Sequence, residues 1–448
     1  MSLAGREHCP EILTYFDGQS GCYFLICLLF VQSSFLLCMF YNFCYFFVFL
    51  LSSIMEFKTN AYFHKRIPYT PPNFLMKGIP KHPSEKVILG CLPTPLHRWS
   101  PPSVFNNNTD NCFDHLDFYI KRDDLSGSDV SGNKVRKLEF LMAECLKEES
   151  DFDSVITIGG IQSNHARATA CVARQLGLEP HLILRGDYDD TNDNSLLGNL
   201  LYDRLVGASI YPVSPSIYAI HGQEKLCNTL AEKLREENKR PFQIPVGGSN
   251  ALGMYGYLEF VNEFMNQIEN DTEFKMKPVD HLVFACGSGG TAAGISLGMR
   301  LYQLYYPDKK IPKIHAVGVC DSPDVFYQHI REMAELSNVN MEYTGDPIEW
   351  LSIYAGQGLG YAQSTQEELD YFTSVATTTG ILLDPVYSLK ALYYTAKNWQ
   401  SMNIENGSRV VFLHTGGTYG TADKAMELLP SLSTLAPKST PYSHWAIK

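Results

Sequence analysis

The stretch from Val283 to Gly294 reads VFACGSGGTAAG, and it predicts more of the fold than any other part of the chain. An apolar run that favours a β-strand leads into a loop, Gly287-Ser288-Gly289-Gly290-Thr291, and small residues that suit a helix follow. Glycines let the backbone approach an anion closely, and the free amide groups at the helix start would then hold a phosphate. The loop is neither a Walker loop nor GxGxxG, so a tight strand-to-helix turn without a ligand is the alternative.

The alternation of strand and helix continues on both sides of this stretch. From Asp117 onward, short β-branched or apolar runs alternate with patterns of about 10 to 20 residues that have helical spacing. Such alternation indicates parallel βαβ layers, in which ligands bind where strands run out into loops at helix starts. The predicted strands are Ser154–Ile158, His181–Leu184, Ser209–Val213, Phe242–Val246, His281–Ala285, Ile314–Val319 and Val410–His414, and the predicted helices include His165–Leu176 and Gly222–Glu237.

Three further junctions carry glycine, amide and hydroxyl residues. Gly159–His165 reads GGIQSNH after the strand VITI, and it places Ser163 and Asn164 at a helix start that faces a crevice. A plain helix cap, which Ser and Asn also supply, is the alternative. Val246–Asn250 (VGGSN) precedes another helix and is also compatible with a simple capped turn, whereas Phe412–Thr418 (FLHTGGT) is a strand that ends in a hydroxyl and two glycines.

One lysine stands at another predicted helix start, within Ser131–Glu139 (SGNKVRKLE). Turn and cap residues precede Lys134, and apolar residues with helical spacing follow it. The positive end of the helix dipole disfavours a cation and lowers the pKa of Lys134, and a neutral amine is the form that reacts with a carbonyl group. The alternative is a solvated basic helix start. In both interpretations we expect Arg136 and Lys137 to be ordinary surface charges.

Composition narrows the class of protein. The chain has 448 residues, 45% of them hydrophobic, so it can bury a large core and we expect about two or three compact units. A net charge of −12 disfavours nucleic acid as a partner and favours a small-molecule substrate. None of the 12 cysteines stands in a C-x-x-C pair or a zinc spacing, which indicates reduced thiols in an intracellular protein and no metal site.

The N-terminal part differs from the rest. Residues 18–55 contain no Asp, Glu, Lys or Arg, and they exceed the roughly 20 apolar residues needed to cross a bilayer. Three interpretations are open: a transmembrane helix that leaves the C-terminal part on the cytoplasmic side, a targeting element, or a non-native extension with translation starting at Met55. Residues 56–82 are basic with a single acid, which suits a weak organelle transit peptide. From about Val87 the composition is that of a globular enzyme.

Six motifs follow one another along the chain: GNK, QSNH, GGSNALG, GSGGT, DPVYS and HTGG. This ordered set resembles the pyridoxal-phosphate enzymes of the tryptophan-synthase beta family, and within it the branch that holds D-cysteine desulfhydrase and 1-aminocyclopropane-1-carboxylate deaminase. The likeness covers about Pro83–Leu429. It implies pyridoxal 5′-phosphate as cofactor, a homodimer, and a two-lobed α/β fold (fold type II) of three αβα layers with mostly parallel twisted sheets.

The expected domain organisation follows from the same resemblance and from the composition. Residues 1–55 form the apolar N-terminal segment and 56–86 a basic leader or linker. The larger, cofactor-binding lobe comprises 87–136 and 246–448, and the smaller lobe comprises 137–245. We expect a mitochondrial or cytoplasmic protein, which contacts a membrane only if residues 18–55 are retained as an anchor.

The resemblance also implies roles for individual residues. Lys134 would form the covalent link to the cofactor's aldehyde, Asn164 would hydrogen-bond the ring hydroxyl, and Ser163 would face the substrate carboxylate, where the deaminases place a nucleophilic serine. Tyr361 and Tyr387 match the tyrosines near the substrate, although Tyr361 lies in a loop with a looser match. The residues implied for the phosphate are Gly287, Ser288, Gly289, Gly290 and Thr291.

Two positions depart from the deaminase pattern. The deaminases place a Glu beside the pyridine nitrogen where this chain has Ser388, and a leucine where it has Thr415, whose hydroxyl could bond a neutral pyridine nitrogen. A weaker electron sink still suffices to expel a good leaving group from the β-carbon. We therefore predict β-elimination of D-cysteine to pyruvate, ammonia and hydrogen sulfide, with the freed Lys134 amine taking the α-proton. The preference for the D isomer follows from the resemblance alone.

Three other hypotheses are kept. The first is 1-aminocyclopropane-1-carboxylate deaminase, as a main or secondary activity that yields 2-oxobutyrate and ammonia. The second is a catalytically idle cofactor-binding sensor. The third is a membrane-anchored interaction protein, and the apolar N-terminus is the only feature that supports it.

Overall fold

A six-stranded sheet is the larger of two main β-sheets in the computed structural model, which describes residues 63–104, 112–186 and 196–435. Its strand order is β11-β10-β9-β12-β4-β3, and all neighbours are parallel except β3 and β4. Every residue of β9 and β12 is buried, as expected for parallel strands covered on both faces. The bounds are β3 Leu96–Arg98, β4 Asp117–Arg122, β9 His281–Cys286, β10 Lys313–Gly318, β11 Ser352–Ala355 and β12 Arg409–His414.

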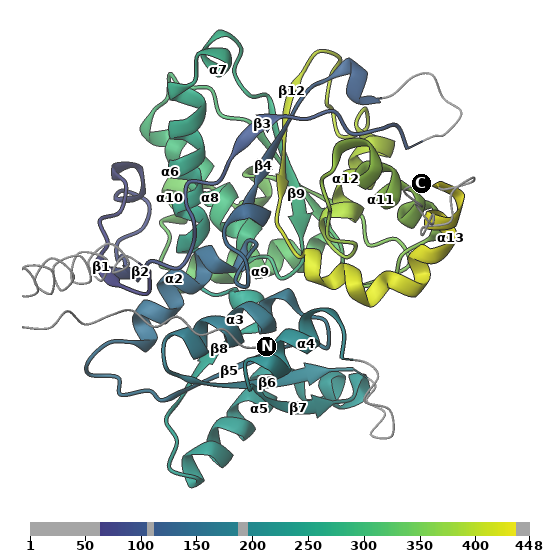
Figure 1. Ribbon diagram of the computed structural model, residues 1–448. Coiled ribbons are helices and arrows are strands. Elements are labelled where there is room, and N and C mark those ends of the chain that lie inside the picture. The colour runs from purple at the N-terminus through teal and green to yellow at the C-terminus, as the bar shows by residue number, and fades with distance from the viewer. Residues whose placement is uncertain (1–62, 105–111, 187–195, 436–448) are drawn as a thin grey trace, which may run out of the picture. The chain divides into compact units, whose positions relative to one another are not determined.

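Helices cover both faces of this sheet (Figure 1). Side chains of β9 alternate between the faces: Leu282 and Phe284 belong to the core shared with α6 and α8, and Val283 and Ala285 to the core shared with α11 and α12. The larger sheet is therefore the middle of three αβα layers. The helices are α6 Tyr255–Asn270, α8 Gly290–Tyr305 and α9 Pro323–Leu336 on one side, and α11 Gln366–Thr379 and α12 Ser388–Asn398 on the other.

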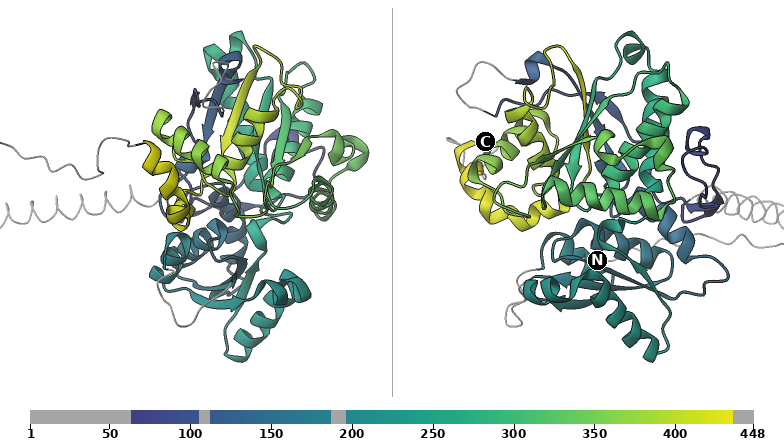
Figure 2. Two further views of the ribbon diagram at one scale, coloured as in Figure 1. Left: turned by 90° about the vertical axis from the view of Figure 1, so that its right-hand side faces the viewer. Right: turned by 180° about the vertical axis from the view of Figure 1, so that it is seen from behind.

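The smaller sheet has four parallel strands in the order β7-β6-β5-β8. On one face, Val155 of β5 packs with Leu138 of α2 and Val172 of α3, and on the other, Ile156 packs with Leu230 of α5. This sheet too lies between helical layers (Figure 2). The bounds are β5 Ser154–Gly160, β6 Glu179–Arg185, β7 Ser209–Val213 and β8 Pro241–Ile244, with α2 Lys134–Cys145, α3 Asn164–Gln175, α4 Gly198–Leu205 and α5 Pro215–Glu236.

The predicted alternation of strands and helices is confirmed. Each predicted strand is present, with ends that differ by at most two residues, and α3 coincides with the predicted helix to within one residue. The predicted helix Gly222–Glu237 matches the second part of α5: the element spans Pro215–Glu236, and the non-helical backbone of Gly222 (φ 67°, ψ 170°) divides it into two helices. Glycine reaches that backbone conformation at no steric cost, so the chain bends there and continues.

The packed region begins upstream of Val87, where globular composition was expected to start. Leu75 and Ile79 are completely buried in the core of the larger sheet, and β1 (Arg66–Pro68) pairs with β2 (Glu85–Val87). The remaining elements are η1 Asn73–Leu75, η2 Cys112–His115, η3 Asp123–Leu125, η5 Val246–Gly248, α7 Thr272–Met276, α10 Met341–Thr344, η6 Pro347–Glu349, η7 Thr418–Lys424 and α13 Ala425–Leu435.

The interpretations of residues 18–55 fall outside the described residues. Within residues 63–104, 112–186 and 196–435, no helix is long and apolar enough to cross a membrane.

Candidate active site

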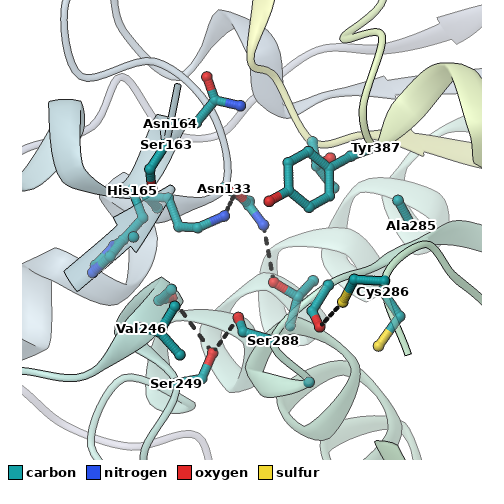
Figure 3. A pocket seen from close by; sticks show the side chains of 18 of the residues that line it. Asn133, Ser163, Asn164, His165, Val246, Ser249, Ala285, Cys286, Ser288 and Tyr387 are labelled. Carbon is teal, nitrogen blue, oxygen red and sulfur yellow. Dashed lines mark hydrogen bonds between the residues drawn. The ribbon is translucent and has the colours of Figure 1, made fainter. Parts of the chain in front are cut away.

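A cavity of about 640 Å³ opens where the carboxyl ends of strands from both sheets meet helix starts. Strands β5, β9 and β12 end at its wall, and α2, α3 and α8 begin there, as expected for a ligand site in parallel sheets. Figure 3 shows Ser163 and Asn164 on one side of the cavity and Tyr387 and Cys286 on the other.

The cavity brings together most of the predicted site residues. Its lining includes Lys134, Ser163, Asn164, Gly287, Ser288, Gly289, Thr291, Tyr361, Tyr387 and Thr415. Gly290 is buried and does not line the cavity, because it is the first residue of α8 behind the loop. Ser388 does not line the cavity either and lies behind Thr415.

Lys134 is the first residue of α2, which confirms its predicted place at a helix start. Its ammonium donates to Oδ1 of Asn133 at 2.8 Å and lies 5.8 Å from the ring centroid of Tyr387. The pKa of Lys134 is lowered from 10.5 to about 8: burial is the largest cause, the Asp384 carboxylate opposes it, and Arg167 adds to it. The sequence interpretation invoked the helix dipole, whereas loss of solvation is the larger cause. The amine is thus neutral in a substantial fraction of molecules at mildly alkaline pH.

The turn before Lys134 is docked against the loop after β12. The backbone amide of Asn133 donates to the carbonyl of Thr415 at 2.9 Å. Gly132 has φ 100°, and a Cβ there would lie 2.9 Å from the same carbonyl oxygen. Only glycine permits both the backbone angle and the close approach, so the GNK and HTGG motifs form one structural unit.

The glycine loop is built as a cradle at the start of α8. Gly289, with φ 84°, precedes the helix, and the amide of Gly290, the first residue of α8, donates to Ser249 Oγ at 3.3 Å. Ser288 Oγ lies 2.7 Å from Ser249 Oγ, and Asn133 Nδ2 donates to Thr291 Oγ1 at 3.1 Å (Figure 3). A Cβ at Gly287 would lie 2.7 Å from the ring of Tyr387. The missing side chains of the glycines leave room for an anion at the helix N-terminus, towards which the amides of the first turn are directed.

The expectation that Arg136 and Lys137 are surface charges is wrong. Their exposed fractions are 2% and 1%. Lys137 donates to the carbonyl of Gly247 and to Ser249 Oγ, both at 3.0 Å, beneath the glycine loop. Burial lowers the pKa of Lys137 well below its usual value, and the nearby Lys134 lowers it further. The sequence conceals this burial because the partners lie more than 100 residues away along the chain.

Arg136 joins α2 to the larger sheet. Its guanidinium donates to both oxygens of Asp123, at 2.9 and 2.8 Å, and to both oxygens of Glu263 on α6, at 2.9 and 3.0 Å. Tyr257 donates to Asp123, and Lys121 pairs with Glu263. This cluster of buried charges fixes the helix that begins at Lys134.

The QSNH motif at the start of α3 is both a helix cap and part of the cavity wall, as the two interpretations of the sequence proposed. Ser163 is the N-cap of α3, its Oγ accepting from the amide of Ala166 at 3.2 Å, and it also lines the cavity. The Asn164 amide is held at both ends: Oδ1 accepts from Asn199 at 2.9 Å, and Nδ2 donates to Asp384 at 3.2 Å. The helix N-terminus therefore faces the cavity with a fixed amide beside it.

Two tyrosines meet at the opposite wall. The hydroxyls of Tyr361 and Tyr387 lie 2.9 Å apart, with the rings edge to face. Burial raises the pKa of both phenols, so both stay protonated near neutral pH. The guanidinium of Arg185 lies 4.8 Å from the ring centroid of Tyr218 and 6.0 Å from that of Tyr361. This wall presents hydroxyl donors and one cation, and no carboxylate touches the tyrosine hydroxyls among the described residues.

The side chains of Ser388 and His414 beside Thr415 are polar and uncharged, and behind them Asp124 Oδ2 lies 3.9 Å from His414 Nε2. Ser388 Oγ lies 3.1 Å from Nδ1 of His414 and 3.4 Å from Thr415 Oγ1. His414 Nδ1 accepts from the amide of Gly416, so its other nitrogen donates to the carbonyl of Leu382. Burial lowers the pKa of His414, which keeps the ring neutral. Thr415 therefore offers the cavity a hydroxyl without an adjacent charge.

Several residues of the site were missed by the sequence interpretation. They are Asn133, Lys137, Asn199, Ser249 and Asp384. Asn133, Ser249 and Asp384 stand inside the motifs GNK, GGSNALG and DPVYS, so a signal was present for them. Lys137 and Asn199 carry no local signal.

Comparisons with known proteins agree with this geometry. The family described as "Pyridoxal-phosphate dependent enzyme" matches residues 87–416. A relative from Arabidopsis thaliana, named bifunctional D-cysteine desulfhydrase/1-aminocyclopropane-1-carboxylate deaminase, mitochondrial, is 43% identical over 82% of this chain and 86% of its own. A D-cysteine desulfhydrase from Serratia proteamaculans is 33% identical over 67% of this chain and 86% of its own.

A solved structure extends the likeness to three dimensions. The crystal structure of an ACC deaminase homologue is 31% identical in sequence, covers 80% of this chain and 98% of its own, and superposes with a TM-score of 0.63. These matches confirm the predicted α/β fold and the resemblance that the six motifs carried. The chain belongs to the family of pyridoxal-phosphate-dependent enzymes.

Proposed function

We propose that the protein is a D-cysteine desulfhydrase, which cleaves D-cysteine by β-elimination to pyruvate, ammonia and hydrogen sulfide. The observation that carries the proposal is the uncharged hydroxyl of Thr415 at the cavity wall, backed by Ser388 and a neutral His414 where a deaminase has a carboxylate. Two relatives named for this activity support it.

The residues present fit pyridoxal 5′-phosphate. The amides at the start of α8 would hold the phosphate, and the buried Nζ of Lys137 lies beneath them, where it donates to Gly247 and Ser249. Lys134, at the start of α2, has the lowered pKa that reaction with an aldehyde requires. Asn164 would donate to the ring hydroxyl, and Thr415 would hydrogen-bond the ring nitrogen.

The chain's own side chains account for the remaining steps. When bound, the cofactor withdraws electrons from Cα of the substrate and so weakens the Cα–H bond. The neutral Nζ of Lys134, held by Asn133, takes the α-proton. Ser163 and the N-terminus of α3 hold the substrate carboxylate. The protonated hydroxyls of Tyr361 and Tyr387 can donate to the sulfur that leaves Cβ as hydrosulfide, and the released enamine hydrolyses to pyruvate and ammonia.

The decisive experiment compares the two isomers of cysteine. Purified, cofactor-loaded protein is mixed with D-cysteine or L-cysteine, and the release of sulfide and pyruvate is followed. We expect sulfide from the D isomer with an equal amount of pyruvate. A yellow preparation that releases no sulfide from D-cysteine would contradict the proposal, and sulfide release would exclude the idle sensor.

A deaminase activity on 1-aminocyclopropane-1-carboxylate is the second candidate. The residues that it would need, Lys134, Ser163, Tyr361 and Tyr387, all line the cavity. The Arabidopsis relative is named for both activities. Release of 2-oxobutyrate from this substrate, measured beside sulfide release from D-cysteine, determines the ratio of the two.

The double variant S388E/T415L is expected to move that ratio toward deamination. A carboxylate at position 388 would reach the place now filled by the Thr415 hydroxyl only when that hydroxyl is removed. The ratio of 2-oxobutyrate to sulfide should rise about tenfold, the effect of one charge-assisted hydrogen bond. T415L alone is the control, since it removes the hydroxyl without adding a charge. An unchanged ratio in the double variant would refute the assigned role of Thr415.

Cofactor capture is expected to depend on pH through Lys134. Its pKa falls from 10.5 to about 8, so the amine that attacks the aldehyde is mostly neutral above about pH 8. The rate at which cofactor-free protein gains visible absorbance after mixing with pyridoxal phosphate should rise with pH, steepest below pH 8, and level off above it. Free Nα-acetyl-lysine serves as the reference, because its rate should keep rising toward pH 10. A protein rate that also rises to pH 10 would argue against a desolvated amine.

We also propose a mitochondrial location and a homodimer. The name of the Arabidopsis relative supports the first. Fractionation of cells, with the N-terminal residue of the mature chain determined, tests both the location and the membrane-anchored alternative, and light scattering tests the dimer. The division into a larger lobe (87–136 and 246–448) and a smaller lobe (137–245) is supported by the two sheets, since β5 to β8 all lie within 137–245.

A further inference from the structure

The amide of Asn164 is oriented by partners on both of its ends. Asn199 donates from Nδ2 to Asn164 Oδ1, and it is itself fixed by Arg167, whose Nε donates to Asn199 Oδ1 at 3.0 Å. At the other end, Asn164 Nδ2 donates to Oδ2 of Asp384 at 3.2 Å. Burial raises the pKa of Asp384 to about 7, so above that pH the group is a carboxylate, which only accepts hydrogen bonds and requires the nitrogen end of the Asn164 amide to face it.

The two oxygens of Asp384 have different tasks. The side chain is completely buried. Oδ1 accepts from the backbone amides of Val386 and Tyr387 and thus stabilises the turn that leads into α12. Oδ2 accepts from Asn164, and no other donor to it is present among the described residues. A role in the turn alone would therefore explain only one of the two oxygens.

The loop after β12 leaves space for this contact. Gly417 has φ 102°, and a Cβ there would lie 2.4 Å from Asp384 Oδ2 and 2.6 Å from Asn164 Nδ2. Any side chain at position 417 would push the Asp384 carboxylate and the Asn164 amide apart. Three segments that are far apart in the sequence thus meet at one hydrogen bond beside the cavity.

We infer that Asp384 is a positioning residue, which holds Asn164 so that an amide N–H, and not the carbonyl oxygen, is presented to the cofactor's ring hydroxyl. An amide nitrogen carries two hydrogens, and the bond to Asp384 uses one of them. The second is then available to an oxyanion in the cavity. The inference rests on the proposed placement of the cofactor and does not depend on which amino acid is cleaved.

D384N tests the inference with little change of shape. The amide oxygen can still accept from Val386 and Tyr387, but its NH₂ group would face the NH₂ group of Asn164, and the hydrogen bond is lost. The dissociation constant for pyridoxal phosphate should rise about 10- to 100-fold. The visible absorbance maximum of the bound cofactor should also shift. D203N is the matched control: Asp203 is completely buried on α4, and neither of its oxygens has a hydrogen-bond partner among the described residues.

The double variant N164D/D384N separates positioning from folding. It restores a hydrogen bond, since the amide introduced at position 384 would donate to the carboxylate introduced at position 164, but it turns that carboxylate toward the ring hydroxyl. We expect the melting temperature of the cofactor-free protein to recover and the cofactor affinity to remain low. Recovery of both would mean that Asp384 acts only through the fold, which overturns the inference.

G417A provides an independent variant if D384N does not fold. It inserts a methyl group between Asp384 and Asn164 and alters neither side chain. G407A is its control, because Gly407 also has a positive φ (78°) but nothing within 4 Å of an added Cβ. We expect G417A alone to weaken cofactor binding. Wild-type affinity and spectrum in G417A, or loss of the fold in G417A but not in G407A, would overturn the inference. These readouts use no amino acid substrate, so they stand apart from a failure of the proposed D-cysteine activity.

Discussion

Replacing Lys134 with alanine is expected to reduce sulfide release from D-cysteine by about 10²- to 10⁴-fold, the range for loss of a positioned general base, and to abolish the covalent link to the cofactor. Lys134 is placed at the start of α2 with its Nζ in the cavity, and its pKa of about 8 makes the amine reactive. Burial of a charged amine costs free energy, so the cofactor-free variant should melt no lower than the wild type. Sulfide release, visible absorbance and thermal unfolding measure the three effects.

Two control variants make this result specific. K134R keeps a positive charge, but arginine stays protonated at any working pH, so it should be as inactive as K134A. K225A removes an exposed lysine from α5 and should leave sulfide release unchanged. Sulfide release by K134A above a tenth of the wild-type rate would show that another group takes the α-proton.

Replacing Arg136 with methionine is expected to lower the free energy of unfolding by about 3–5 kcal/mol, the usual cost of removing one partner from a buried ion cluster. Arg136 donates four hydrogen bonds to the buried carboxylates of Asp123 and Glu263. Methionine fills a volume similar to that of arginine but carries no charge. Among the described residues, Lys121 would then be the only cation beside the carboxylates of Asp123 and Glu263. Urea unfolding, with the midpoint and slope both recorded, measures the loss.

An exposed pair of similar geometry is the control for this variant. Arg331 also donates to both oxygens of a carboxylate, Asp346, at 3.0 and 2.9 Å, but its side chain is 33% exposed. Water can replace its hydrogen bonds, so R331A should move the urea midpoint far less than R136M. Equal shifts in the two variants would contradict the view that burial makes the Arg136 cluster costly to break.

Burial also predicts how the cluster responds to acid. Burial alone would raise the pKa of Asp123, but Arg136 and Lys121 more than offset this and hold it below 3.8. A carboxylate with a lowered pKa stabilises the fold above its ordinary pKa, and this contribution is lost as pH falls through the folded value. In R136M that contribution is removed, so the variant should unfold at a higher pH than the wild type during acid titration.

The sequence predicted the junctions of the active site well because each is a local pattern. A strand, a glycine turn and a helix start follow one another within about ten residues, and Ser163, Asn164 and the Gly287–Thr291 loop belong to such units, whereas Lys134 was recognised from the turn and helix start alone. The order of the motifs along the chain then identified the family.

The sequence did not predict the burial of Arg136 and Lys137, because helical spacing cannot show that a helix is covered on its charged face. Asp123 and Glu263 lie 13 and 127 residues from Arg136, and only the fold brings both to it. The hydrogen bond between Asn164 and Asp384 was not predicted for the same reason, since the two residues are 220 positions apart in the sequence. What the sequence left out is thus the set of long-range polar contacts that fix the site.

Helix α2 takes part in the packing of both sheets. Leu138, Leu141 and Met142 lie in the core of the smaller sheet, while Arg136 is tied to Asp123 and Glu263 at the larger one. The two sheets therefore share one element, and Lys134 is its first residue. The reacting amine thus keeps its place relative to both sheets, because the helix that carries it is fixed to each of them.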